Sequence, residues 1–412
     1  MPAKVAFVFS QFPCYDEVFI LREMAALKER LDLTIYSIKR NRRDPVRHQI
    51  SLPLLERVVY SPLFFSRPLW AANLRVLTRH PLRYLAALGE IIRLHWPSPE
   101  MLLKSLAIFP QAVYFARLCR LKGIDRVHGQ WATYPAAAAL VISRLNRSGF
   151  SFTGHAHDIY LKMAALKGKL RRADFVITCT AANRDHLLSL APDIDPGKIK
   201  VVYHGVDLDH YPFRGERRRP RGGQFRILSV GSLFECKGYE TLLSACRLLQ
   251  ARDFDFRCRI VGGGHLESRL KKLVDEWGLS PRVEFTGYQR QEDMPEHYRW
   301  ADLLVLAAVG KIHWGIPNVL LEALATGVPV ACTHLPSLPE LLGEPSCGFS
   351  FPEGRPDLIA ELIVKLSRQD DLLVAHGKAG RKKVEEKWDI RINSLKIAEL
   401  FQKTVKAGGK DD

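Results

Sequence analysis

The chain has 412 residues, of which 47% are hydrophobic and 25% charged, and its formal net charge at pH 7 is +17. This is the composition of an ordinary globular protein, and it argues against a disordered chain and against a polytopic membrane protein. No apolar run approaches the roughly 20 residues that span a bilayer, and the length favours two domains. The charge indicates an anionic partner, and nucleic acid, anionic lipid and phosphorylated substrates all remain open.

The N-terminal sequence MPAKVAFVFSQFP contains one lysine and only about five consecutive apolar residues, so it lacks the pattern of a signal peptide. The eight cysteines are scattered singly, without a C-x-x-C pair or a Cys/His cluster at metal-ligand spacing. We therefore expect reduced thiols, no metal site and a cytoplasmic location.

Short β-branched runs alternate with longer helical patterns along the chain. The strands predicted in the first half are Val5–Phe9, Leu33–Ser37, Arg126–His128, Ser151–Thr153, Phe175–Thr178 and Lys200–Tyr203. Those predicted in the second half are Phe225–Val230, Arg257–Val261, Val283–Thr286, Leu303–Leu306 and Pro329–Thr333. This alternation predicts parallel βαβ units and therefore doubly wound α/β domains.

The segment PFRGERRRPRGG, Pro212–Gly223, is basic and broken by proline and glycine, which is typical of a linker between domains. We therefore expect a first domain at residues 1–213 and a second at residues 224–386. Ligands of such sheets bind beyond the carboxyl ends of the strands, so the predicted active site is a cleft between the two domains.

Residues 62–122 are helical in pattern, aromatic and basic, and they interrupt the short-loop spacing of the first domain. Their basic residues, which face few acids, are Arg67, Arg75, Arg79, Arg83, Arg93, Lys104, Arg117, Arg120 and Lys122. A basic amphipathic surface with tryptophan, phenylalanine and leucine suits an anionic membrane surface. The alternative is a helical insertion that packs on its own domain and leaves its arginines in solvent. The pattern leaves both interpretations open.

Three predicted strands of the second half end in glycine. Gly231 precedes a short loop with Lys237, Gly262–Gly264 follow the next strand, and Gly287 with Tyr288 follows the third. Glycine lets a backbone approach a ligand closely, a helix N-terminus favours an anion, and a lysine adds a point charge for phosphate. The competing explanation is a close turn between a strand and a helix, because the G-x-G-x-x-G spacing of a dinucleotide site is absent.

The stretch GIPNVLLEALATGVPV begins a helix at Pro317 and Asn318, and the backbone amides of Ile316–Val319 would be free to meet an anion there. Glu322 stands among leucines that are expected to enter the core. A buried carboxylate needs partners, and the hydroxyl groups of a ligand would serve.

Histidines lie near the ends of two predicted strands of the first half: His128 on one, and His155 and His157, followed by Asp158, on the next. A single histidine at such a place is more often structural than catalytic. Three of them with a carboxylate, on successive strands of one sheet, favour a functional site.

The order of the motifs HGQWATYPAAAAL, FSFTGHAHDIY, KIKVVYHGVDLDHY, ILSVGSLFECKG, IVGGGHLESRL, VEFTGY and GIPNVLLEALATGVPV resembles the retaining GT-B glycosyltransferases of family 4. The resemblance is to those that build exopolysaccharides and colanic-acid-type polymers, and it extends over nearly the whole chain. It implies an α/β GT-B fold in which two Rossmann-like domains face a central cleft. It also implies a last helix, at residues 387–405, that returns to the first domain.

The resemblance implies that the second domain binds a nucleotide-diphosphate sugar as co-substrate and the first binds the acceptor, with no cofactor and no metal. The implied donor-binding residues are Gly231, Ser232, Lys237, Gly262, Gly263, Gly287, Tyr288, Trp314, Gly315, Ile316, Pro317, Asn318, Val319 and Glu322. Among them Lys237 would hold the phosphates and Glu322 the ribose hydroxyls. The implied catalytic residues are His128, His155 and Asp158.

Three positions depart from the family pattern. Trp314 stands where relatives carry a carboxylate eight residues before the helix glutamate, Ser232 replaces an arginine, and Gln130 replaces the second histidine of an H-x-H pair. A lost guanidinium beside a diphosphate removes a charge-assisted hydrogen bond unless another arginine replaces it.

The leading hypothesis is a glycosyltransferase that transfers a sugar with retention onto a polyprenyl-diphosphate-linked saccharide, in the cytoplasm or at the inner face of the membrane. The alternative is a catalytically degenerate relative that binds a glycan or a partner protein. A nucleic-acid partner is not expected, because no nucleic-acid-binding motif accompanies the charge.

Overall fold

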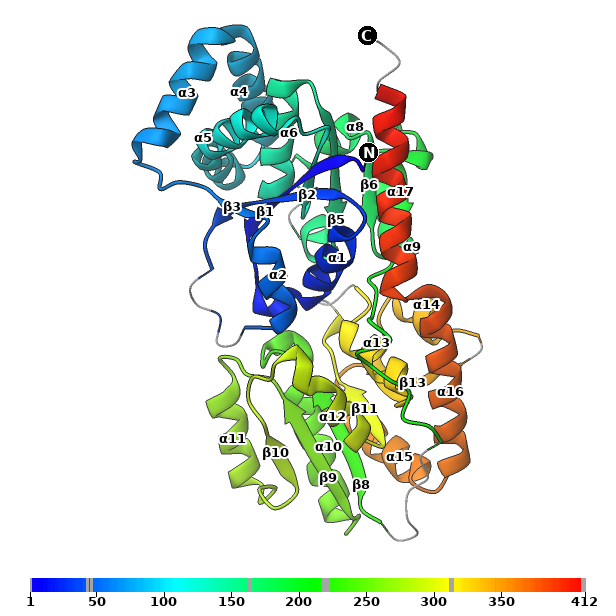
Figure 1. Ribbon diagram of the computed structural model, residues 1–412. Coiled ribbons are helices and arrows are strands. Elements are labelled where there is room, and N and C mark those ends of the chain that lie inside the picture. Colours follow the sequence, from blue (N-terminus) through cyan, green and yellow to red (C-terminus); the bar gives the residue numbers. More distant parts are fainter. Residues whose placement is uncertain are drawn as a thin grey trace. The chain divides into compact units, whose positions relative to one another are not determined.

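The computed structural model describes residues 2–41, 44, 47–161, 163, 165–216, 223–310, 315–344 and 346–408 (Figure 1). Its contacts divide the chain into two compact units. Unit 1 comprises Met1–Asp44, Ile50–Tyr203 and Asn393–Asp412, and unit 2 comprises Pro45–Gln49 and His204–Ile392.

The first domain therefore ends earlier than the predicted residue 213. Val206 already belongs to unit 2, because its backbone N–H donates to the carbonyl of Trp388 at 2.7 Å and its carbonyl accepts from Ile390 at 3.1 Å. Tyr211 is fully buried as well. Residues 217–222 of the predicted linker lie outside the described residues.

Unit 1 is built on a parallel sheet in the order β3-β2-β1-β4-β5-β6-β7. Its strands are β1 (Lys4–Gln11), β2 (Asp32–Lys39), β3 (Val58–Tyr60), β4 (Arg126–Gln130), β5 (Gly149–Gly154), β6 (Phe175–Thr178) and β7 (Ile199–Val201). The six predicted strands are all present, whereas the edge strand β3 was not predicted.

Helices cover both faces of this sheet. They are α1 (Val18–Lys28), α2 (Leu52–Leu55), α3 (Arg67–Arg79), α4 (Pro81–His95), α5 (Pro99–Lys122), α6 (Tyr134–Asn146), α7 (Ala156–Tyr160), α8 (Leu166–Arg172), α9 (Ala181–Leu190) and α17 (Ile390–Gly408). Helix α17 returns to unit 1, where Ile397, Ala398 and Phe401 join the core formed by β1 and α1.

The predicted helical insertion consists of α3, α4 and α5, which lie together in Figure 1. Asn73 of α3 anchors it, since its side-chain amide donates to the carbonyls of Leu69 at 2.9 Å and Pro110 at 3.0 Å. Among the described residues α5 is long and apolar enough to cross a membrane by length and composition alone. Its buried residues Phe109 and Phe115 belong to the core of unit 1, so that criterion carries little weight here.

Unit 2 repeats the architecture with a parallel sheet in the order β10-β9-β8-β11-β12-β13. Its strands are β8 (Phe225–Val230), β9 (Phe256–Val261), β10 (Val283–Phe285), β11 (Leu303–Leu306), β12 (Val330–Thr333) and β13 (Gly348–Phe351). Its helices are α10 (Tyr239–Ala251), α11 (Glu267–Glu276), α12 (Met294–Trp300), α13 (Asn318–Thr326), α14 (Leu338–Leu342), α15 (Pro356–Leu366) and α16 (Asp370–Lys387). The edge strand β13 was not predicted. The prediction of two doubly wound α/β domains is confirmed.

Candidate functional sites

Each sheet has one point at which the chain order reverses, and ligands of doubly wound sheets bind beyond the strand ends there. In unit 2 the reversal lies between β8 and β11, which are hydrogen-bonded neighbours. In unit 1 it lies between β1 and β4. Parallel strands end at the same edge of a sheet, so the loops that follow β8, β9, β10 and β11 are brought together in unit 2.

The glycine turns after β8, β9 and β10 are joined directly by backbone contacts. Gly262 N–H donates to the carbonyl of Gly287 at 2.9 Å, and Leu233 N–H donates to that of Gly263 at the same distance. Gly262 has a φ of +134°, and a Cβ there would lie 2.1 Å from the carbonyl oxygen of Gly231. Only glycine permits this approach of two loops, so these turns form one backbone surface at the strand ends.

Lys237 closes a short 3-10 turn, Glu235–Lys237, in the loop after β8. Gly238 follows it with a φ of +63°, and a Cβ on Gly238 would lie 1.9 Å from the carbonyl oxygen of Ala307, just past β11. The aliphatic part of Lys237 passes within 3.5 Å of the position a Cβ of Gly231 would occupy. The predicted phosphate-binding lysine thus lies at the reversal point of the sheet.

Tyr288 lies against the same surface. Its ring would be 2.4 Å from a Cβ on Gly263, so the absence of a side chain at Gly263 lets the ring pack on the turn. The Tyr288 side chain is 37% exposed. An aromatic ring that is partly exposed beside a glycine turn offers a stacking face for a planar base.

Helix α13 starts at Asn318, with Pro317 in the N-cap position and no side-chain cap. Asn318 is therefore the first residue of the helix, and no side chain of the cap residue caps the first amides. Ile316 is buried, and Gly315 and Val319 are partly exposed. Trp314 lies outside the described residues, together with Lys311, Ile312 and His313.

Glu322 is buried on α13, as expected, among Leu320, Leu321 and Leu324. The hydroxyl of Tyr298 on α12 donates a hydrogen bond to its Oε2 at 2.6 Å. The expectation that a ligand rather than the protein completes the hydrogen bonds of Glu322 is therefore wrong for this oxygen. Nothing in the sequence pattern marked Tyr298, because the pairing crosses between two helices.

A cavity of about 660 Å³ opens at the reversal point of unit 1. Its walls come from the ends of β1 and β2, the loop after β4, α5 and α7. The lining residues are Ser10, Glu17, Ile38, Lys39, Lys104, Ala107, Ile108, Gln111, Trp131, Thr133, Tyr134, His157 and Asp158. Of the predicted site residues only Asp158 lines it directly, beside His157.

Two residues of this cavity carry signs of function. Trp131 has a φ of +89°, a left-handed conformation that bulky residues rarely adopt and that costs on the order of 1–3 kcal/mol. Burial raises the pKa of Glu17 to about 7, while a hydrogen bond with Trp131 opposes the rise. A strained aromatic residue beside a carboxyl group that titrates near neutral pH is typical of a binding or catalytic site.

Asp158 positions the loop that carries Trp131. Its Oδ1 accepts from the backbone N–H of His155 at 2.7 Å, and its Oδ2 accepts from that of Ala132. Lys169 of α8 is fully buried and donates to the carbonyls of Ala132 at 2.8 Å and Thr133 at 2.9 Å. Burial raises the pKa of Asp158 and lowers that of Lys169, and their mutual attraction opposes both shifts. Asp158 is therefore a positioning residue.

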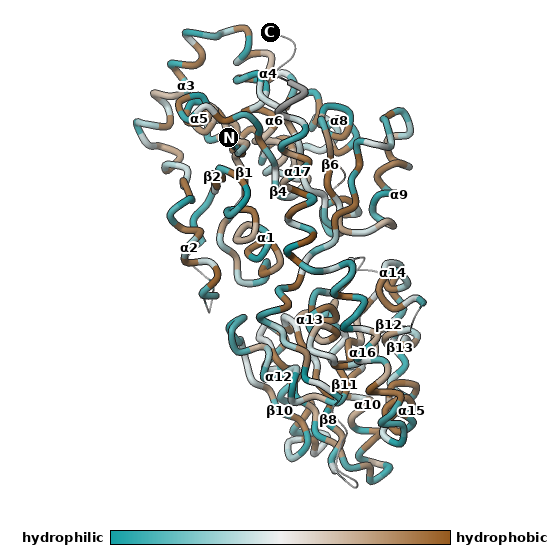
Figure 2. The backbone as a smooth tube through the Cα atoms, turned by 45° about the vertical axis from the view of Figure 1, so that its right-hand side comes forward, coloured by the Kyte–Doolittle hydropathy of each residue, from teal (hydrophilic) through white to brown (hydrophobic). Residues whose placement is uncertain are grey.

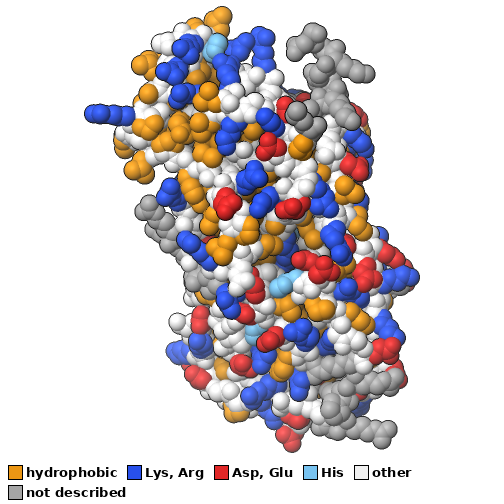
Figure 3. Space-filling model, in the orientation of Figure 1, with side chains coloured by type: hydrophobic (Ala, Val, Ile, Leu, Met, Phe, Trp, Pro, Cys, Tyr) orange, Lys and Arg blue, Asp and Glu red, His pale blue; other side chains and the backbone are white. Residues whose placement is uncertain are grey.

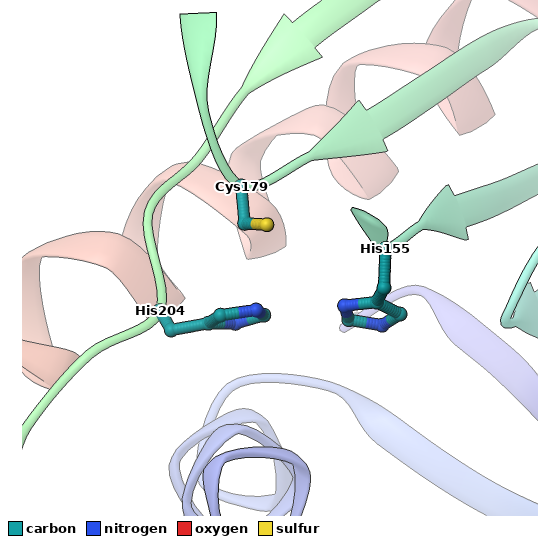
Figure 4. Close-up of side chains that lie close together, drawn as sticks. All are labelled: His155, Cys179 and His204. Atoms are coloured by element: carbon teal, nitrogen blue, oxygen red, sulfur yellow. The ribbon is translucent and has the colours of Figure 1, made fainter. Parts of the chain in front are cut away.

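His155 lies at the carboxyl end of β5, and its ring packs on that of Trp131 with centroids 4.3 Å apart. Figure 4 shows its side chain and that of Cys179, which follows the neighbouring strand β6. Their potential ligand atoms lie within 4.8 Å of each other, a proximity that single, scattered cysteines did not predict. His204, drawn in the same figure, begins the longer segment of unit 2, His204–Ile392.

His128 is a core histidine. It has no exposed surface, its ring nitrogens bond to the hydroxyls of Ser151 and Thr153 at 2.9 Å, and burial lowers its pKa to about 3. The rings of Phe7 and Phe401 pack around it at 4.9 and 5.4 Å. This geometry does not support the catalytic role predicted for His128, because its side chain points into the sheet–helix interior.

Two of the three positions that depart from the family pattern, Gln130 and Ser232, are among the described residues. Gln130 is fully buried and its amide donates to Glu23 at 3.3 Å, so it pairs with the protein. Burial raises the pKa of Glu23 to about 7. Ser232 lies in the loop after β8, and nothing in the structure explains this departure.

Two doubly wound units, each with a candidate site at its reversal point, define the GT-B class of fold. The solved structure of Alr3699/HepE from Anabaena, in complex with UDP and glucose, matches 97% of this chain and 99% of its own with a TM-score of 0.69 at 16% identity. That likeness shows the fold.

Family comparisons cover both units. Residues 70–210 match the family described as Glycosyltransferase Family 4, and residues 215–383 match Glycosyl transferases group 1. The two matches together cover more than half of the chain. Each half of the chain is therefore similar to a family of glycosyltransferases.

Among the relatives, the amylovoran biosynthesis glycosyltransferase AmsK of Erwinia amylovora is 32% identical over 212 residues, which cover 50% of this chain and 51% of AmsK. The N-acetylgalactosamine-N,N'-diacetylbacillosaminyl-diphospho-undecaprenol 4-alpha-N-acetylgalactosaminyltransferase of Campylobacter jejuni is 26% identical over 61% of this chain and 69% of its own. The chain spans about half the length of the first relatives that it matches.

Proposed function

We propose that this chain is a glycosyltransferase that moves a sugar from a nucleotide-diphosphate donor onto a saccharide carried by polyprenyl diphosphate, with retention at the anomeric carbon. Unit 2 binds the donor and unit 1 binds the acceptor. The observation that carries the proposal is the backbone surface of unit 2, in which three glycine turns and Lys237 lie at the carboxyl ends of the strands beside the reversal point. Helix α13 follows β11, the next strand across that point.

The donor side follows from that surface. A diphosphate needs N–H donors and positive charge at close range, and the glycine turns, Lys237 and the N-terminus of α13 offer all of these. Glu322 accepts one hydrogen bond from Tyr298 and retains acceptor capacity for the ribose hydroxyls, because a carboxylate has about four lone-pair sites. The complex of HepE with UDP and glucose supports a nucleotide sugar as the donor class.

The acceptor side follows from the cavity of unit 1. Ile38, Ala107 and Ile108 give it apolar walls, while Lys39 and Lys104 supply positive charge. A lipid-linked saccharide with a diphosphate group combines these two chemistries. The diphospho-undecaprenol named for the Campylobacter relative supports this acceptor class.

The reaction breaks the bond between the anomeric carbon and the phosphate oxygen, and the departing diphosphate takes the electron pair. The acceptor hydroxyl forms the new bond on the same face of the sugar and transfers its proton to the departing phosphate oxygen. Lys237 and the helix terminus stabilise the charge that develops on the diphosphate. His155, held beside Trp131, is the histidine assigned to the transferred sugar, in place of His128.

The test has two parts. Calorimetric titration with UDP, GDP and ADP is expected to show binding of one of them, and absence of binding by all three would contradict the donor assignment. Turnover is then measured with the sugar nucleotides of that base in membranes containing native acceptor lipids, and the anomeric configuration of the product is read by NMR. A product of inverted configuration would refute retention.

A degenerate relative that binds a glycan or a partner protein is the second candidate. Ser232 favours it, because an arginine in that place would contact the diphosphate. It predicts ligand binding without turnover in the same membrane assay. For both candidate functions, we propose that the protein is cytoplasmic and peripheral to the membrane.

A further inference from the structure

The outer face of the helical insertion exposes apolar side chains in a regular pattern. On α3 the residues Trp70, Leu74 and Leu77 recur at positions i, i+4 and i+7 and are exposed, while Leu69, Ala72 and Asn73 form its buried face. A helix that already packs one apolar face has no structural need for a second. Figure 2 shows hydrophobic and hydrophilic residues alternating along α3.

The same apolar surface continues before and after α3. Phe65 is 91% exposed and Leu82, near the start of α4, is 82% exposed, and Leu85 lies one turn further on. Figure 3 shows hydrophobic side chains mixed with lysine and arginine over the region where α3 and α4 lie, with few acidic ones. An exposed patch of this kind marks an interaction surface.

Two hollows lined by arginine lie on the same helices, and residues at the end of α6 line both of them. One, of about 150 Å³, is formed by α3, α5 and α6, and its arginines are Arg75, Arg79, Arg117 and Arg120. The other, of about 500 Å³, is formed by α4, α6 and α8, and its arginines are Arg83, Arg93, Arg144, Arg147 and Arg172. Together the two hollows are lined by nine arginines of unit 1.

Acidic partners do not balance these charges. Glu90 is the one carboxylate among the lining residues of the two hollows, and it pairs with Arg144 and Arg172. Within the described residues no ion pair joins a carboxylate to Arg75, Arg79, Arg83, Arg93, Arg117 or Arg147. Some of these arginines lie near helix C-termini, where the helix dipole favours a cation. The dipole accounts for a single cation at a helix end, but not for a cluster of arginines.

We propose that the outer face of α3 and α4, with the two arginine hollows, is a docking surface for an anionic phospholipid bilayer. The exposed aromatic and leucine side chains enter the boundary between headgroups and acyl chains, and the arginines hold lipid phosphates. Guanidinium groups suit phosphate because they donate bidentate hydrogen bonds. Bound lipid would keep unit 1 at the surface that carries a lipid-linked acceptor. The docking itself is independent of the proposed transferase activity.

The test is co-sedimentation of the full chain with vesicles of phosphatidylcholine alone and of phosphatidylcholine with phosphatidylglycerol in equal parts, at low and high salt. Binding is expected only to the anionic vesicles, and it should weaken as salt increases. Changing Arg75, Arg79, Arg83 and Arg93 to glutamine should lower the partition coefficient by roughly tenfold or more, because each basic residue near such a surface contributes to binding. A separate variant, Leu74→Ser with Leu82→Ser, should also weaken binding while leaving the net charge unchanged.

The matched control changes Arg252 and Arg368 of unit 2 to glutamine. These two arginines line a surface hollow with Glu361 and Lys365, far from the helical insertion in the chain. The control is compared with a docking variant in which only Arg75 and Arg79 are changed to glutamine, so that both lose two positive charges. Equal losses of binding in these two variants would show a general charge effect and overturn the proposal.

Two further outcomes would overturn it. Inorganic phosphate or glycerol phosphate that displaces the protein from vesicles at millimolar concentration would point to a site for a soluble anion. Tighter, salt-dependent binding to a duplex or single-stranded nucleic acid than to anionic vesicles would point to nucleic acid. Failure of the native protein to bind anionic vesicles at low salt would refute the docking surface, whether or not the donor titration succeeds.

Discussion

The two units share one topology but line their reversal points with different material. In unit 2 the lining is backbone: glycine turns that touch at distances no side chain would allow, with Lys237 passing over them. In unit 1 the lining consists of side chains: Trp131, Tyr134 and Glu17 surround a cavity, and residues of α5 form another of its walls. If the units bind the two substrates as proposed, a diphosphate of constant structure is bound by a rigid backbone surface and the larger acceptor by side chains.

The largest effect is expected from the backbone of unit 2. Gly238→Ala places a Cβ 1.9 Å from the carbonyl oxygen of Ala307 at a positive φ, so the free energy of unfolding should fall by about 3 kcal/mol or more. Gly287→Ala is the matched control: its φ of +69° carries strain but no atom lies within 4 Å, and a loss of about 1 kcal/mol is expected. Urea unfolding measures both, and equal losses would show that the loop contact does not matter.

Next in size is the removal of the buried carboxylate. Glu322→Ala deletes the proposed ribose contact and the acceptor of the Tyr298 hydroxyl, so the affinity for the donor nucleotide should fall by about 10- to 100-fold. Tyr298→Phe keeps the carboxylate and should change that affinity by no more than about threefold. Calorimetric titration of the folded variants with the donor nucleotide measures both affinities. An unchanged affinity in Glu322→Ala would refute the assignment of Glu322 to the ribose.

Two aromatic substitutions, one in each unit, test which substrate each unit binds. Trp131→Ala should raise the KM for the acceptor by about tenfold, because it removes a wall of the cavity, and leave the donor dissociation constant unchanged. Tyr288→Ala should weaken donor binding by a similar factor and leave the acceptor KM unchanged. Steady-state kinetics with each substrate varied in turn tests both, and an effect of Trp131→Ala on donor binding alone would exchange the roles of the units.

A smaller effect is expected from pH. The pKa of Glu17 is raised by burial to about 7, so the carboxyl group is neutral below that pH and charged above it. The KM for an anionic acceptor should therefore rise as the pH passes 7, and the folded state should lose stability over the interval between the ordinary carboxyl pKa and 7. Glu17→Gln should remove the rise in KM, whereas the exposed control Glu56→Gln should keep it. A rise that persists in Glu17→Gln would contradict the assignment.

The smallest effect is expected from a chelator. Lys237 and the start of α13 are proposed to neutralise the departing diphosphate, so EDTA should leave turnover unchanged within error. The control is a matched assay with added magnesium. A loss of activity in EDTA that magnesium restores would show that these groups do not suffice.

Several elements could be predicted because their causes are local. The parallel strands follow from short apolar runs between helices, and the glycine turns and Lys237 follow from residue type at a strand end. The family resemblance led to the GT-B class, which the fold and the family comparisons confirm. The strands β3 and β13, each at an edge of its sheet, were missed.

The site in unit 1 shows the limit of that reasoning. His128, His155 and Asp158 looked equivalent in the sequence, as polar residues near strand ends. The structure separates them by direction, since His128 points into the core, Asp158 holds a loop, and His155 packs on Trp131. The burial of Lys169 could not be predicted, because a lysine in the basic stretch LKGKLRR is expected in solvent. In the structure it is buried and donates hydrogen bonds to two backbone carbonyls.

The sequence by itself determined the class of fold, the order of the glycine turns and the basic character of the helical insertion, because periodicity, backbone freedom and charge are properties of neighbouring residues. Only the tertiary structure decided which polar groups share a cavity, which are satisfied by the protein and which face of the insertion is left exposed. Those outcomes depend on contacts between residues far apart in the chain, such as Tyr298 with Glu322 and Asn73 with Pro110.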